Sequence, residues 1–224
     1  MVPLGNEGDA RAVTGPLPWV SRRVPLPVVL FLVVLTAAAT FLFTNRSDRP
    51  LDTSADVGFL RDMSAHHAQA VEMALIIYDK TEEPMLKTVA YDMAVTQQGQ
   101  IGRMDGWLAA WDLPMRSNQP PMAWMAGHDH GGGGSGEVPD RMPGLATDEQ
   151  MAQLREATGL EAEVLFLELM IEHHRGGVDM AEAAVRFATD EKVISLAQGM
   201  IDAQESEIDL MNEMLVERGA EPLE

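Results

Sequence analysis

The sequence predicts an all-α protein in which a four-helix bundle follows one apolar helix. Three observations lead to this prediction. Long stretches carry apolar residues at helical spacing, and none alternates as a strand would. The pattern of the first half of the bundle recurs in the second half at one constant offset. A nearly continuous apolar run precedes both halves, which places residues 24–44 in a helix separate from the duplicated bundle over 53–218.

The composition limits the chemistry that the protein can support. The chain has 224 residues with 16 Met, six His and no Cys, and its net charge is -19. Without Cys, disulfides, thiolate nucleophiles and cysteine-type zinc sites are excluded, so any soft ligand must be a thioether or an imidazole. Nucleic acid is not expected as a partner, because phosphate contacts need a basic face.

The residues before the bundle predict a tail, a membrane anchor and a linker. Residues 1–23 combine Gly, Pro and charges without periodicity, which is typical of disorder. Residues 24–44 would form about 31 Å of helix, enough to cross a bilayer. We therefore expect a single-pass anchor, an extracytoplasmic bundle and a linker over 45–52. A cleaved signal peptide is the alternative, although the apolar run continues beyond the three alanines at 37–39.

Cap and breaker residues set the limits of the four long helices. Ser54 or Thr53 is suited to cap the first, and Pro84 falls in the first turn of the second. Gly219 follows the fourth, where glycine commonly ends a helix. The four helices are expected at about 54–79, 83–111, 160–188 and 190–218.

The connection between the second and third long helices is unusually long and predicts the topology. It covers about residues 113–146, is rich in Pro and Gly, and could span a bundle about 40 Å long several times over. A long second connection is what ferritin-like bundles use, and it makes the first and third helices antiparallel. A short helix follows, in which Thr147 and Gln150 form a capping-box pattern, and Gly159 separates it from the third long helix.

The two helical hairpins match at an offset of 107 residues. The second helices match as well as the first, so the turns between them have equal length. A hairpin cannot bury its apolar stripe alone, whereas two copies packed face to face can. The matched positions of the first helices are Phe59, Leu60, Met63, His66, His67, Val71, Met73 and Ala74, which recur as Phe166, Leu167, Met170, His173, His174, Val178, Met180 and Ala181.

Methionine and histidine on the inward faces form a candidate metal site. Met63, His66 and His67 fall within about a 100° arc of one helix face, and the second copy repeats this arrangement. Both His pairs lie near mid-helix, so antiparallel helices would bring them together. Four buried imidazoles are costly unless they are hydrogen-bonded or bound to a metal.

The residue types favour copper over iron or zinc. Di-iron bundles use Glu-x-x-His, whereas the first position here is Met63 in one copy and Met170 in the other. Thioether and imidazole suit Cu(I) better than they suit ions that prefer carboxylate. Methionine is also a common packing residue, so a core without thioether ligands is the alternative.

Three polar helix positions and the long loop add further candidates. Gln97 and Gln204 could each hold an imidazole in place, or could reach water at an edge. Glu207 stands at the position of Gln100, so only the second copy offers a carboxylate there. The loop is either a Gly-rich linker or a mobile arm that collects metal through Met122, Met125, His128 and His130.

The repeated motif resembles the hallmark of the domain-of-unknown-function 305 family, which is Met-x-x-His-His followed by a small residue and Met-Ala. It occurs at 63–74 and at 170–181, and the resemblance covers about residues 53–218. It implies a ferritin-like fold, export, copper-binding members and no established enzymatic activity. The family usually has Gln-x-x-Glu in its second helix, and the first copy departs from this. The resemblance assigns the metal role to Met63, His66, His67, Met73, Met170, His173, His174 and Met180.

The function favoured by the sequence is copper storage, buffering or delivery by an extracytoplasmic, membrane-anchored protein. Its expected partners are a metal ion and, through residues 24–44, the lipid bilayer; the sequence indicates no protein partner. One alternative is a metal-free interaction subunit of a membrane complex. Another is a ferritin-like metal oxidase, although an enzyme is disfavoured because Glu-x-x-His is missing. An oxidase could take oxygen ligands from Glu168, Glu172, Asp179 and Glu207.

Overall fold

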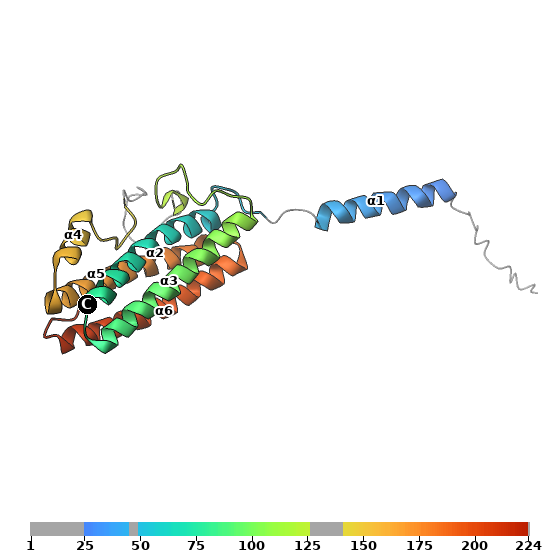
Figure 1. Cartoon of the computed structure of the whole chain (residues 1–224). Helices are drawn as coiled ribbons and strands as arrows, with labels where there is room; N and C mark the ends of the chain where they lie inside the picture. The colour runs from blue at the N-terminus through green and yellow to red at the C-terminus, as the bar shows by residue number, and fades with distance from the viewer. Residues whose placement is uncertain (1–24, 45–48, 126–140, 224) are drawn as a thin grey trace, which may run out of the picture. The chain divides into compact units, whose positions relative to one another are not determined.

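The structure, a computed structural model, describes residues 25–44, 49–125 and 141–223 of the chain. These residues contain six α-helices, one short 3-10 helix and no strand (Figure 1). The chain divides into two units, residues 1–48 and residues 49–224. The all-α class predicted from the sequence is confirmed.

Helix α1 belongs to the first unit and spans Leu26–Thr44. Its apolar side chains are exposed, Phe31 and Val34 among them. In the described part of the chain, no helix is long and apolar enough to cross a membrane. The anchor expected over 24–44 is therefore not supported by the structure. The disorder expected for 1–23 concerns residues outside the described ones, as does the first half of the expected linker, residues 45–48.

Four long helices in the second unit form the bundle. They are α2 (Ala55–Lys80), α3 (Pro84–Ala110), α5 (Gly159–Phe187) and α6 (Glu191–Glu217), and each end lies within one residue of the predicted limit. Ser54 caps α2 by accepting a hydrogen bond from the backbone N–H of Val57. Gly219 follows α6 with a φ of 73°, a conformation that glycine adopts without strain.

The short helix α4 (Asp148–Glu156) has the predicted capping box. Thr147 Oγ1 accepts from the Gln150 backbone at 3.1 Å, and Gln150 Oε1 accepts from the Thr147 backbone at 2.8 Å. The expected role of Gly159 was wrong, because Gly159 is the first residue of α5 rather than a separator. Its φ of 58° lets the chain turn directly from Thr158 into the helix. The loop also contains an unexpected 3-10 helix, η1 (Ala123–Met125).

Helices α2 and α5 run antiparallel at the centre of the bundle. Helix α2 packs against both α3 and α5, and α5 packs against α6 (Figure 1). Where α2 begins and α5 ends, the buried carboxylate of Asp56 accepts from the backbone N–H groups of Thr189 and Asp190 at 2.9 and 2.8 Å. At the other end, Thr81 Oγ1 donates to Glu163 at 2.7 Å. The antiparallel arrangement expected from the long connection is confirmed.

The apolar core consists of two clusters along the bundle. Met63 of α2 and Met180 of α5 belong to one, whereas Met73 of α2 and Met170 of α5 belong to the other. Residues that correspond in the two sequence copies thus fall in opposite clusters, as antiparallel helices require. The histidines lie on α2 and α5 between these methionines, in the stretch where the two clusters meet. We call this stretch, comprising His66, His67, His173 and His174, the histidine layer.

Candidate metal centre

The histidine layer brings both His pairs into the buried centre of the bundle. All four side chains are at most 1% exposed. The ring centroids of His66 and His173 are 3.8 Å apart with planes inclined by 36°, and those of His173 and His174 are 6.3 Å apart. The meeting of the two pairs, expected from their mid-helix positions, is confirmed.

His66 and His173 use Nε2 to bind backbone oxygens. His66 Nε2 donates to the carbonyl of Pro143 at 2.9 Å, and His173 Nε2 donates to the carbonyl of His66 at 3.0 Å. A carbonyl can only accept, so each proton lies on Nε2 and the lone pair lies on Nδ1. These contacts fix both the ring orientation and the tautomer.

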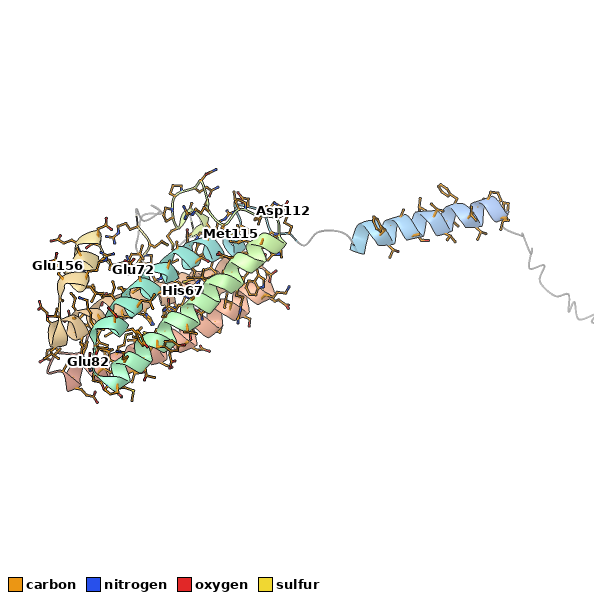
Figure 2. The ribbon with its side chains drawn as sticks, in the orientation of Figure 1. His67, Glu72, Glu82, Asp112, Met115 and Glu156 are labelled. Atoms are coloured by element: carbon orange, nitrogen blue, oxygen red, sulfur yellow. The ribbon has the colours of Figure 1, made fainter. Side chains whose placement is uncertain are left out.

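His67 and His174 use Nε2 to bind side chains from the second helix of their hairpins. His67 lies midway along α2, facing α3, and its Nε2 donates to Gln100 Oε1 at 2.7 Å (Figure 2). His174 Nε2 donates to Glu207 Oε2 at the same distance of 2.7 Å. Glu207 was expected to assist the site, whereas Gln100 was not given a role. The role of Gln100 could have been predicted from the repeat, because Gln100 corresponds to Glu207.

The second nitrogen of three imidazoles is left without a partner. Nδ1 of His66, His67 and His174 is buried and has no hydrogen bond to any described residue. An unmet buried acceptor costs about 1–3 kcal/mol, so it needs an explanation such as an ion. The lone pair of a neutral imidazole is also the atom that binds a metal. The three Nδ1 atoms therefore have the chemistry of metal ligands.

Burial keeps the imidazoles of His66, His67 and His173 uncharged. Desolvation, partly offset by the bond to Pro143, lowers the pKa of His66 to about 4. Desolvation and the neighbouring His66 lower the pKa of His67 to about 3, and the pKa of His173 is well below its usual value for the same two reasons. At neutral pH a metal at these three rings would thus displace no proton from Nδ1.

Four methionines stand on either side of the histidine layer. Met63, Met73, Met170 and Met180 are fully buried. Each cluster contributes one methionine from α2 and one from α5. Within the described residues, no three His, Asp or Glu side chains form a group that could hold a metal. The donors concentrated at this layer are imidazole nitrogen and thioether sulfur.

Gln97 and Gln204 lie in the core, but the hydrogen bond expected from each of them to an imidazole is not made through Oε1. Both are buried, and Oε1 of each lacks a hydrogen-bond partner among the described residues. Gln204 Oε1 packs against α5, where a Cβ at Gly177 would come within 2.3 Å of it. The role expected of these two amides, holding a ring in place, falls instead to the residues three positions further along each helix.

The described end of the crossover loop covers the histidine layer. The side-chain amide of Gln69 on α2 bonds both backbone groups of Ala146. It donates to the Ala146 carbonyl at 2.9 Å and accepts from the Ala146 N–H at 2.8 Å. The loop touches α5 closely enough that a Cβ at Gly144 would come within 2.3 Å of the carbonyl of Glu172. These contacts hold the carbonyl of Pro143 in place to accept the hydrogen bond from His66.

Gly176→Ala is expected to displace this part of the loop. Its Cβ would lie 2.2 Å from the carbonyl oxygen of Pro143, a backbone atom that cannot move without the loop. We expect the free energy of unfolding to fall by about 1–3 kcal/mol, measured by thermal denaturation. Gly199→Ala on α6 is the matched control, because nothing lies within 4 Å of its Cβ, and it should stabilise by about 0.5–1 kcal/mol. Equal destabilisation by both would show that the loop contact is unimportant.

The beginning of the crossover loop is fixed to α2, which contradicts the idea of a mobile metal-collecting arm for this part. Met122 is 2% exposed, and its N–H donates to Asp62 Oδ2 at 2.7 Å. Trp124 Nε1 donates to the same oxygen at 2.9 Å, and Met125 packs against the neighbouring core cluster. Met122 therefore lies in the same core cluster as Met63 and Met180 rather than on a free arm. The other loop candidates lie outside the described residues; they are His128 and His130.

The sequence profile of the domain of unknown function DUF305 matches residues 56–215, a range that contains both hairpins and the whole histidine layer. The chain belongs to the DUF305 family. It resembles the crystal structure of a putative secreted DUF305 protein from Streptomyces coelicolor, with 48% identity, a TM-score of 0.69, and coverage of 78% of this chain and 99% of that one. A DUF305 fragment from Deinococcus radiodurans matches with 27% identity and a TM-score of 0.60, over 73% of this chain and 96% of that one.

Copper-bound structures of CopM are also similar to this DUF305 chain. The Cu(I)-bound form has 25% identity and a TM-score of 0.54, over 72% of this chain and 96% of CopM. The Cu(II)-bound form has 25% identity and a TM-score of 0.52, over 70% of this chain and 92% of CopM. A sequence relative, the uncharacterised protein L153 of Acanthamoeba polyphaga mimivirus, is 27% identical over 77 residues. That match covers 34% of this chain and about half of L153, 49% of its length.

Proposed function

We propose that this DUF305 protein binds copper, preferentially Cu(I), at the histidine layer. The observation that carries the proposal is that three imidazoles of the layer each bury an Nδ1 lone pair that no described residue satisfies. Neutral imidazole and thioether are ligands that Cu(I) favours, whereas hard ions favour carboxylate and carbonyl oxygen. CopM, which is 25% identical, has been solved with Cu(I) and with Cu(II), and this supports the choice of metal.

The proposed ligands come from the two inner helices. The imidazoles would bind copper through Nδ1, since Nε2 of each already donates a hydrogen bond to an oxygen atom. The thioethers would complete the coordination from the two clusters on either side. A layer of this kind suits storage, buffering or delivery of the ion, because its four imidazoles are at most 1% exposed. The ligand set proposed is Met63, His66, His67, Met73, Met170, His173, His174 and Met180.

Competition between metals tests this proposal. Cu(II) binds to the majority of nitrogen sites more tightly than Zn(II) or Fe(II) does, so Cu(II) binding alone would not distinguish the metals. The full-length protein is therefore titrated with Cu(I) without oxygen, against a chromogenic Cu(I) chelator and in excess Zn(II) or Fe(II). We expect Cu(I) to be retained in both mixtures. Displacement of Cu(I) by either divalent ion would refute the proposal.

We also propose that the bundle works outside the cytoplasm. The proposal is supported by the apolar segment over 24–44 and by similarity to a Streptomyces coelicolor protein described as putatively secreted. Fractionation of cells that express the tagged full-length chain tests it, and a cytoplasmic bundle would contradict it. The N-terminal sequence of the exported protein then distinguishes a retained anchor from a removed signal segment.

A further inference from the structure

Two imidazoles of the histidine layer have contacts that are equal in geometry but different in charge. His67 donates to the Gln100 amide at 2.7 Å, and His174 donates to the Glu207 carboxylate at 2.7 Å. The two contacts correspond at the offset of 107 residues. In each case Nδ1 is buried and has no partner in the described part of the chain. The two halves of the repeat therefore differ in the acceptor that holds the ring, which is neutral in the first half and charged in the second.

A carboxylate changes the ring that it holds in two ways. The hydrogen bond is charge-assisted and about twice as strong as a neutral one, and it raises the basicity of the opposite nitrogen. The negative charge also attracts a nearby cation, with twice the energy for a divalent as for a monovalent ion at equal distance. The side chain of Glu207 is 31% exposed and that of His174 is fully buried, so water screens this charge only in part.

We infer that Glu207 determines the oxidation-state preference of copper at His174, biasing that half of the layer towards Cu(II), while Gln100 leaves His67 suited to Cu(I). The inference rests on the proposed copper function and adds that the two halves of the repeat are unequal ligands. Glu207 acts through the imidazole and is a positioning residue. The amide of Gln100 fixes the same tautomer without adding charge.

Exchanging the two acceptors tests this inference. Glu207→Gln should lower Cu(II) affinity about tenfold or more, the lower end of the range for such outer partners, and should change Cu(I) affinity much less. The reduction potential of the bound copper should then rise, by about 59 mV for each tenfold change in the ratio of affinities. Gln100→Glu should shift the potential in the opposite direction. The readouts are competition titrations for each ion, the potential, and the Cu(II) electron paramagnetic resonance spectrum.

Matched variants control for charge alone. Glu205→Gln removes one charge from an exposed position of α6, and Gln98→Glu adds one to an exposed position of α3. Neither position contacts an imidazole, so both variants should shift the potential much less. Equal shifts in the control and test variants would overturn the inference, as would an unchanged ratio of affinities in Glu207→Gln.

The outcomes also separate this inference from the proposed function. If the parent protein does not retain Cu(I), the copper function itself fails. If the parent retains Cu(I) and the exchange leaves the potential unchanged, only the inequality of the two halves is refuted. Circular dichroism verifies that each variant is folded. Should Glu207→Gln unfold, the direction of the shift in Gln100→Glu decides alone.

Discussion

His67→Leu is expected to make the metal-free bundle more stable and its Cu(I) binding weaker. The imidazole buries an Nδ1 that no described residue satisfies, at a cost of about 1–3 kcal/mol. Leucine removes that atom and fills similar space. The hydrogen bond to Gln100 is lost, but Gln100 is partly exposed and can bind water instead. We expect the free energy of unfolding to rise by about 1 kcal/mol.

The opposite effect on copper makes this variant diagnostic. Losing one ligand should weaken Cu(I) binding tenfold or more, equivalent to about 1.4 kcal/mol. Thermal denaturation with and without Cu(I) measures both effects, because a ligand of the native state raises its stability. His174→Leu is the comparison and should gain less stability, since it also breaks a charge-assisted contact with Glu207. A clear loss of stability in metal-free His67→Leu would mean that Nδ1 is not an unmet group.

Helix limits could be predicted from the sequence because local chemistry determines them. The hydroxyl of Ser54, the ring of Pro84 and the flexible backbone of Gly219 each act on adjacent backbone groups. All three stand at the helix ends that the sequence predicted. Gly159 is the exception, because a glycine with positive φ can begin a helix as well as end one. The burial of Met122 had no local signal. It depends on Asp62, which is 60 residues away in the chain.

The repeat located the histidines, but spacing alone could not assign their partners. Gln97 and Gln100 are three residues apart and lie on neighbouring parts of the same helix face. Which of them reaches the ring depends on how α3 is rotated against α2, and side-chain packing sets that rotation. The carbonyl of Pro143 was beyond prediction for a related reason: it belongs to a loop that reaches His66 across 77 residues of chain.

Met63→Leu and Met170→Leu test whether sulfur takes part in the site. Each variant alone should lower Cu(I) affinity tenfold or more, about 1.4 kcal/mol, and the double variant should lose the sum of the two. Leucine and methionine have similar volumes, so the exchange should cost less than about 1.5 kcal/mol of stability. The two residues belong to different core clusters, so the single variants examine the two sides of the histidine layer separately.

Met214→Leu provides the control for these methionine exchanges. Met214 is 2% exposed and lies near the end of α6, where its carbonyl accepts from Arg218 at 2.9 Å. It is seven residues beyond Glu207, about 10 Å along the helix, so its sulfur should not affect copper. Cu(II) affinity should fall less than Cu(I) affinity in the test variants, because thioether selects the softer ion. If Cu(I) binds the double variant as tightly as the parent, the methionines only fill space and copper is held by histidine alone.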